Sequence, residues 1–159
     1  MREYNCDRHI ELLKYKEELK KQNKRIITHD PIRYKELIQY SARTSEYLHL
    51  SQKNDYLQLI KDFLTFQIDA KEFDEKFSKK VAVIEKKNRV LGQNYGELKR
   101  IELTPRSLGF GEWISEIYLC CNEFYEEYNP NEGKDPALKT EEELRDAVTS
   151  LLPEIQKYF

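Results

Sequence analysis

The sequence of 159 residues contains little glycine and proline, five residues of each. These two residue types interrupt helices and form the turns of β-rich proteins, so their scarcity argues against a fold of many short strands. Charged residues make up 35% of the chain and recur with helical rather than alternating spacing. We therefore expect an all-α protein.

Cysteine is also scarce, and its placement is informative. Cys6, Cys120 and Cys121 are an odd number, and the adjacent pair is poorly placed to form a disulfide with itself. Such usage is typical of a reducing compartment. The sequence lacks the apolar run of a signal peptide and any apolar stretch near the roughly 20 residues that span a bilayer. We expect a soluble, intracellular protein, in the cytoplasm or the interior of an organelle.

The spacing of apolar residues predicts six helices. Their expected ranges are Asp7 to Arg25, Pro31 to Leu50, a segment capped by Ser51 or Asn54 that ends at Phe66, Ala70 to Leu91, Gly111 to Tyr128, and a last helix that Thr140 begins. Asp69 with Glu72, and Thr140 with Glu143, have the spacing of a capping box. Gly92 to Leu103 is the longest expected loop, and Thr104-Pro105 is expected to open the element that follows it.

The four helices from Asp55 onward are joined by one tight turn and two longer loops. An antiparallel four-helix bundle is the economical way to bury their apolar stripes. We therefore divide the chain into a helical N-terminal extension, residues 1–50, and a bundle domain, residues 55–159. Because its apolar stripe is narrow, we expect the first helix to be peripheral.

Positive charge is missing from one long stretch, since no Lys or Arg occurs from Ser107 to Gly133. From Gly111 to Phe159, 12 acidic and 4 basic side chains give a net charge of −8, so the first 110 residues must carry +6 to reach the total of −2. Six carboxylates lie in the stretch without positive charge: Glu112, Glu116, Glu123, Glu126, Glu127 and Glu132. Such a concentrated negative field favours a positively charged partner.

Most of these carboxylates fall on one face of the helix predicted from Gly111 to Tyr128. At 100° per residue, one side carries Trp113, Ile117, Cys121, Phe124, Tyr125 and Tyr128. The other side carries Glu112, Glu116, Glu123, Glu126 and Glu127. An ordinary solvated helix face mixes both signs of charge, as Ala70 to Leu91 does. We predict that the six carboxylates, including Glu132, bind a protein partner and that the apolar side is core.

The sequence offers little for catalysis. No glycine-rich phosphate loop follows a strand, and neither G-x-S-x-G nor H-E-x-x-H occurs. Cys6 and His9 have a ligand spacing, but no second pair completes a zinc site. Di-metal sites in four-helix bundles need two Glu-x-x-His motifs, and Glu46-x-x-His49 is the one present. We expect a protein that is not an enzyme and has no cofactor or metal.

Four motifs between Tyr56 and Ile155 carry a resemblance to a known family. They are Leu59-Ile60-Lys61-Asp62-Phe63-Leu64, then Ile68-x-Ala70-x-x-Phe73-x-x-x-Phe77, then the acidic helix from Glu112 to Tyr128, and finally Glu143-Leu144-Arg145-x-x-Val148-x-x-Leu151-Leu152. Over about two-thirds of its length the chain resembles the colicin D immunity protein family, bacterial proteins that block a ribonuclease toxin. The resemblance implies a four-helix bundle whose acidic surface fills the basic tRNA-binding cleft of the toxin.

Two other interpretations stay open. In one, the chain is a small structural or adaptor subunit whose acidic helix docks on a basic partner, while the first helices bind elsewhere in a larger assembly. In the other, the basic first part, with Lys20-Lys21 and Lys24-Arg25, contacts nucleic acid directly. The second is disfavoured because residues 1–50 carry a net charge of only +3. The tyrosines of this part indicate a protein-contact surface instead.

Overall fold

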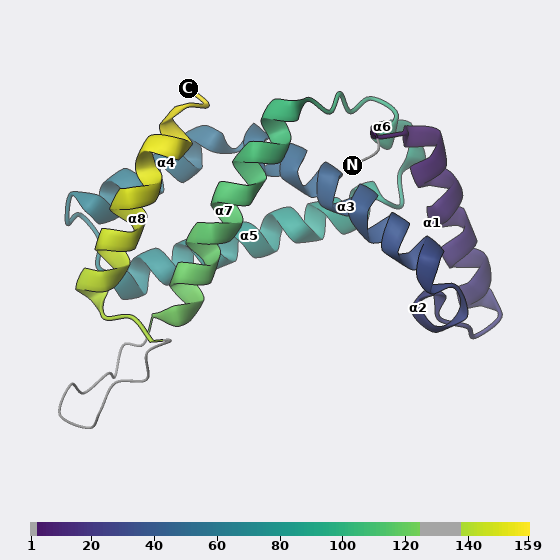
Figure 1. Ribbon diagram of the computed structural model, residues 1–159, viewed down its shortest axis with the longest axis horizontal. Helices are drawn as coiled ribbons and strands as arrows, with labels where there is room; N and C mark the ends of the chain where they lie inside the picture. Colours follow the sequence, from purple (N-terminus) through teal and green to yellow (C-terminus); the bar gives the residue numbers. More distant parts are fainter. Residues whose placement is uncertain (1–2, 125–137) are drawn as a thin grey trace.

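The structure is a computed structural model that describes residues 3–124 and 138–159 (Figure 1). The described residues form helices and no named strand. The helices are α1 (Cys6–Lys21), α2 (Ile26–His29), α3 (Pro31–Ser51), α4 (Lys53–Leu64), α5 (Ala70–Leu91), α6 (Tyr95–Leu98), α7 (Pro105–Glu123) and α8 (Glu141–Gln156). The expectation of an all-α protein is confirmed for this part of the chain.

Three predicted helix starts are confirmed by their caps. At α3, Asp30 accepts a hydrogen bond from the backbone N–H of Arg33, and a proline occupies the first turn. At α5, Asp69 accepts from the backbone N–H of Glu72. At α8, Thr140 and Glu143 form the complete capping box. Local sequence thus determines where these helices begin.

Other predicted bounds are wrong. The first expected helix ends at Lys21 rather than Arg25, and the short helix α2, which was not predicted, follows it. The turn between α1 and α2 places Asn23 at a φ of 56°, a left-handed conformation that asparagine tolerates. Neither Ser51 nor Asn54 caps α4, because α3 continues through Ser51 and Gln52 precedes α4 without a side-chain cap. The loop expected after Leu91 contains the short helix α6.

The helix α7 begins at Pro105, so the element start predicted at Thr104-Pro105 is confirmed, although the amphipathic stretch was expected only from Gly111. It ends at Glu123, where the extended residue Phe124 terminates it. Proline suits the first turn of a helix, where its missing N–H leaves no partner unsatisfied. The two glycines at positions 109 and 111 do not stop the helix, and each lies where another side chain approaches closely. The residues expected to extend this helix, 125–128, lie outside the described part.

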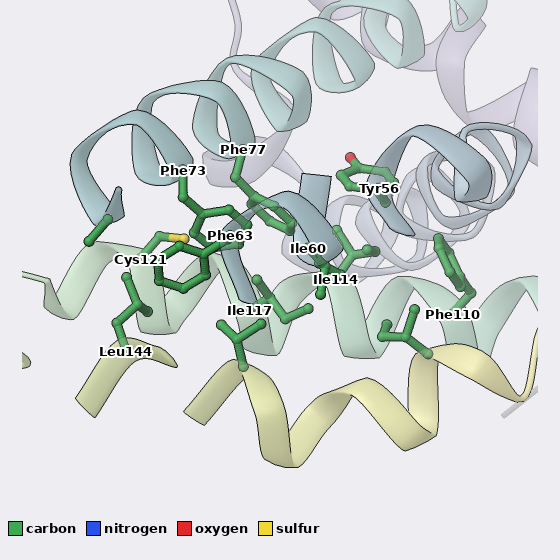
Figure 2. Packing of buried hydrophobic residues seen from close by; sticks show 13 residues of the cluster. Tyr56, Ile60, Phe63, Phe73, Phe77, Phe110, Ile114, Ile117, Cys121 and Leu144 are labelled. Atoms are coloured by element: carbon green, nitrogen blue, oxygen red, sulfur yellow. The ribbon is translucent and has the colours of Figure 1, made fainter. Parts of the chain in front are cut away.

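One hydrophobic core is shared by α4, α5, α7 and α8 (Figure 2). Its buried members are Tyr56, Ile60, Phe63, Ala70, Phe73, Phe77, Phe110, Ile114, Ile117, Cys121, Leu144, Val148 and Ile155. We call this set the bundle core. Phe63 and Phe73 stack with their ring centroids 4.3 Å apart, which fixes α4 against α5.

The turn between α4 and α5 is held by α8. Arg145 donates hydrogen bonds to the backbone oxygens of Phe63 and Ile68, and Glu141 accepts one from the backbone N–H of Ala70 at 2.6 Å. Nη2 of Arg145 also lies 3.3 Å from Oε1 of Glu141. The end of one hairpin is therefore tied to the start of the last helix.

A second, smaller core lies between α1, α2 and the first half of α3. Its buried members are Leu12, Leu19, Ile26, Leu37 and Tyr40. We call this set the N-terminal core. Arg8 of α1 makes two hydrogen bonds, of 2.9 and 2.8 Å, to the carboxylate of Glu36 on α3. The first helix is therefore not merely peripheral, because it supplies part of a core of its own.

The helix α3 joins the two cores. Its first half packs against α1 and α2, and its second half packs against α7 and α5 (Figure 1). The contact between α3 and α7 is the most extensive between two helices in the described residues. The domain division between residues 50 and 55 stays a prediction, and its boundary falls at the end of this shared helix.

Candidate functional site

Three of the six predicted binding carboxylates, Glu112, Glu116 and Glu123, lie in the described residues, and all three are on α7. We call these three the acidic face. Glu112 and Glu116 are exposed, on the side of α7 opposite the buried residues Ile114 and Cys121. Within the described chain, neither forms an ion pair. Glu126, Glu127 and Glu132 lie outside the described residues.

Glu123 differs from the other two carboxylates. Its side chain lies 3.1 Å from the ammonium of Lys139, and its backbone oxygen accepts a hydrogen bond of 2.6 Å from the backbone N–H of Lys139. The hydrogen bond to Glu123 raises the pKa of Lys139. The stretch from Ser107 to Gly133 contains no Lys or Arg, but the fold places a cation from outside it beside Glu123. Lys139 is 16 residues away in sequence, so only the fold reveals the pair.

The apolar side of α7 is rotated relative to the prediction. The buried stripe is Phe110, Ile114, Ile117 and Cys121, whereas Trp113 and Phe124 are half-buried at its edge. The prediction began the helix at Gly111 and so missed Phe110. The spacing of four, three and four residues from Phe110 was the signal that identifies the correct face.

Sequence reasoning considered Glu46, on α3, only as a possible metal ligand and missed that it packs against Gly111 of α7. A Cβ atom added to Gly111 would lie 2.3 Å from Cγ of Glu46, so the glycine permits this close approach. Within the described residues, Oε2 of Glu46 is buried without a hydrogen-bond partner. Burial raises the pKa of Glu46 to about 7, Arg43 lowers it, and Glu112 raises it further. A carboxyl group that resists ionisation thus lies at the crossing of α3 with α7, beside Glu112.

A partly buried polar network connects α3, α4 and α5. The hydroxyl of Ser45 donates to Glu85 at 2.5 Å, Nε2 of His49 lies 3.5 Å from Glu85, and Nδ1 of His49 is 2.7 Å from the hydroxyl of Tyr56. Carboxylate, imidazole and hydroxyl groups in a row can serve catalysis. Tyr56, however, is 0% exposed, so a substrate cannot reach its hydroxyl. The network is suited to fixing three helices relative to one another.

The residues that suggested metal ligands take part in other contacts. Glu46 faces α7 and His49 faces α4 and α5, so the Glu-x-x-His pair does not share a site. Nδ1 of His9 lies 2.9 Å from the hydroxyl of Tyr4. Across residues 3–124 and 138–159, no three His, Cys, Asp or Glu side chains gather closely enough to hold a metal ion.

No helix in the described part of the chain has the length and apolar character needed to cross a membrane. No protein-family model matches the chain, and no curated protein or solved structure matches it significantly. The surface and contacts described above are therefore what a functional proposal can be built on.

Proposed function

We propose that the chain is a non-catalytic protein-binding module whose acidic face docks on a basic surface of a protein partner. The observation that supports this proposal is the exposure of Glu112 and Glu116 on α7, with no ion pair to either in the described residues. Carboxylates that lack an internal cation keep their charge available for an external one.

The resemblance to the colicin D immunity protein family implies the kind of partner. In this proposal the partner is a ribonuclease toxin, which the chain binds inside the cell. A ribonuclease cleft needs Lys and Arg to bind the phosphates of RNA. A fixed row of carboxylates can form ion pairs with the same cations. In this proposal α4, α5, α7 and α8 form the antiparallel four-helix bundle of that family. The core that these four helices share is consistent with it.

The packing of α7 favours such a role because it holds the carboxylates in place. α7 contacts α3, α5 and α8, and its inner side contributes Phe110, Ile114 and Ile117 to the bundle core. A preorganised charged surface loses little entropy on binding and steers a charged partner during diffusion. We therefore expect fast, salt-dependent association.

A second candidate function is that of a small helical adaptor subunit in a larger assembly. It is favoured by exposed isoleucines on α3, where Ile32 is 83% exposed and Ile38 is 50% exposed. Large apolar side chains at these positions suit contact with a further protein. The acidic face would bind one partner and α3 another.

The test is to capture binding partners from the native host and then to purify the principal one. We expect a basic ribonuclease whose RNA cleavage is inhibited by the wild-type chain. The variant Glu112→Lys with Glu116→Lys should bind it at least tenfold more weakly, because each reversed charge repels a cation at close range. Circular dichroism should show unchanged helicity, since exposed substitutions usually change stability by less than about 0.5 kcal/mol.

A matched control places the same two reversals elsewhere, at Glu75→Lys and Glu102→Lys, which are exposed and lie off α7. The control should retain inhibition. If both variants bind alike and the association rate is insensitive to salt, the acidic face is only solvated surface. Recovery of a stable assembly without a nuclease would favour the adaptor.

A further inference from the structure

A second surface of the molecule has the opposite charge. A cleft of about 570 Å³ lies between α1, α3, α5 and α6, with Lys16 and Lys20 from α1 and Arg89 from α5 on its walls. Glu17 is the one carboxylate that lines it. In the described residues, Lys16, Lys20 and Arg89 form no ion pair within 4.0 Å, although Arg89 lies near enough to Glu85 to lower the pKa of that carboxyl group. The cleft is therefore suited to an anion.

Tyr95, from α6, also lines this cleft and is half-buried. The ammonium of Lys14 lies 5.4 Å from the centroid of its ring, a cation–π distance that holds the ring in place. An aromatic ring beside a group of cations can stack on a planar ligand while the cations bind its charge. The sequence-based prediction treated this segment as a loop and gave it no role.

The floor of the cleft is fixed by hydrogen bonds between α3 and α5. Oδ1 of Asn88 accepts from the hydroxyl of Thr44 at 2.6 Å, and Nδ2 of Asn88 donates to the backbone oxygen of Ser41 at 2.9 Å. Both Asn88 and Ser41 line the cleft. These bonds hold α5, and with it Arg89 next to Asn88, in a fixed position relative to α3, which favours affinity for a rigid ligand.

We propose that this cleft binds a nucleotide, with the phosphates on Lys16, Lys20 and Arg89 and the base against Tyr95. The volume of about 570 Å³ lies within the roughly 300–1,000 Å³ of small-molecule sites. Three cations on the walls of one cleft suit a triphosphate, and Lys and Arg are the usual partners of phosphate oxygens. This inference does not depend on the acidic face, which lies on α7.

The experiment is isothermal titration calorimetry of the full chain with three probes: ATP, inorganic tripolyphosphate and adenosine. ATP should bind most tightly, tripolyphosphate should bind more weakly, and adenosine should bind weakest. Affinity for ATP should fall as salt is raised, because the contacts are mainly ionic. A longer anion, a 20-nucleotide RNA, serves as a fourth probe.

Variants assign the binding to the cleft. Lys16→Gln with Arg89→Gln should reduce ATP affinity at least tenfold, whereas Lys86→Gln with Lys87→Gln, an equal loss of charge on exposed residues of α5 that do not line the cleft, should leave it within about twofold. Tyr95→Leu should weaken ATP but not tripolyphosphate. Melting curves confirm that each variant is folded. If the Lys16 and Arg89 pair is not folded, Lys20→Gln is measured in its place.

Three results would overturn the proposal. The first is the absence of ATP binding to the folded wild-type chain. The second is an equal loss of affinity in the cleft pair and in the control pair, which would mean that only the overall field attracts the anion. The third is binding of RNA without binding of ATP, which would indicate an open nucleic-acid surface.

Discussion

The two cores of the molecule differ in how they are stabilised. The bundle core contains 13 buried residues, and five of them, Tyr56, Phe63, Phe73, Phe77 and Phe110, are aromatic side chains with no exposed area. The N-terminal core contains five buried residues, and one of them, Tyr40, is 9% exposed. Its helices are joined in addition by the ion pair of Arg8 with Glu36 and by Arg33, which lies 4.5 Å from the ring centroid of Tyr15.

This difference indicates that stability is distributed unevenly. Hydrophobic burial contributes roughly in proportion to the apolar area removed from water, and exposed ion pairs contribute little. We therefore expect α1 and α2 to open at a lower free energy than the bundle. Because α3 belongs to both regions, its second half should remain folded with α7 when its first half opens.

The largest effect should come from Phe73→Ala. Removing this ring leaves a cavity beside Phe63 in the bundle core, and such truncations cost about 3–5 kcal/mol of unfolding free energy. Urea unfolding followed by fluorescence of Trp113, which packs against this core, measures the loss.

Leu12→Ala, the corresponding truncation in the N-terminal core, should instead speed hydrogen exchange in α1 and α2 and leave the Trp113 transition nearly unchanged. Equal loss in the Trp113 transition would show that the two cores unfold as one.

Gly111→Ala tests the junction between the regions. In most helix interiors this substitution is stabilising, but here the new Cβ would lie 2.3 Å from Cγ of Glu46 and 3.2 Å from its Cα. Overpacking of this kind costs about 1–3 kcal/mol. Gly96→Ala is the control, since its nearest neighbour would be Oδ1 of Asn94 at 3.6 Å. Thermal melts compare the two, and a Gly111→Ala protein as stable as the wild type would mean that α3 and α7 can separate freely.

The two regions should respond oppositely to pH. Burial lowers the pKa of His9 to about 4, so the folded state resists protonation and stability falls as the pH drops from about 6.5 towards 4. Burial raises the pKa of Glu46 to about 7, so its stabilising contribution is complete below about 4.5 and is lost as the pH rises through 7. His9 belongs to the N-terminal region, and Glu46 lies where α3 meets α7.

Between pH 6.5 and 8 only the Glu46 effect should be visible, and the wild type should lose stability over this range. Glu46→Gln should abolish that loss, because it removes the titrating group. Urea midpoints measured at pH 6.5, 7 and 8 for both proteins provide the comparison. Parallel curves for wild type and variant would show that Glu46 titrates normally in the folded protein.

The smallest effect should come from Arg8→Gln. This change removes both hydrogen bonds to Glu36 and the ion pair with Glu11, on side chains that are partly solvent-exposed. Exposed pairs of this kind contribute about 0.2–1 kcal/mol. Hydrogen exchange of α1 amides should accelerate slightly, while Lys21→Gln, which breaks the exposed pair with Glu18, should change nothing measurable. If Arg8→Gln lost more stability than Leu12→Ala, ion pairs rather than apolar burial would be the main stabilisation of α1.

The sequence by itself determined the helical class, the ranges of α3 and α5, and the caps at Asp30, Asp69 and Thr140, because these features depend on contacts within a few residues. It also located the carboxylates Glu112 and Glu116 on a solvent-facing side of a helix, since helical periodicity is a local property.

Only the tertiary structure decided which charges remain unpaired and which are buried. Lys139 contacts Glu123, Glu46 is enclosed against Gly111, and Lys16 and Lys20 of α1 line the same cleft as Arg89 of α5. The two cores likewise arise from contacts between segments that are distant in sequence. Electrostatic environment depends on distance and solvent access, and both are set by how helices pack rather than by the spacing of residues along any one of them.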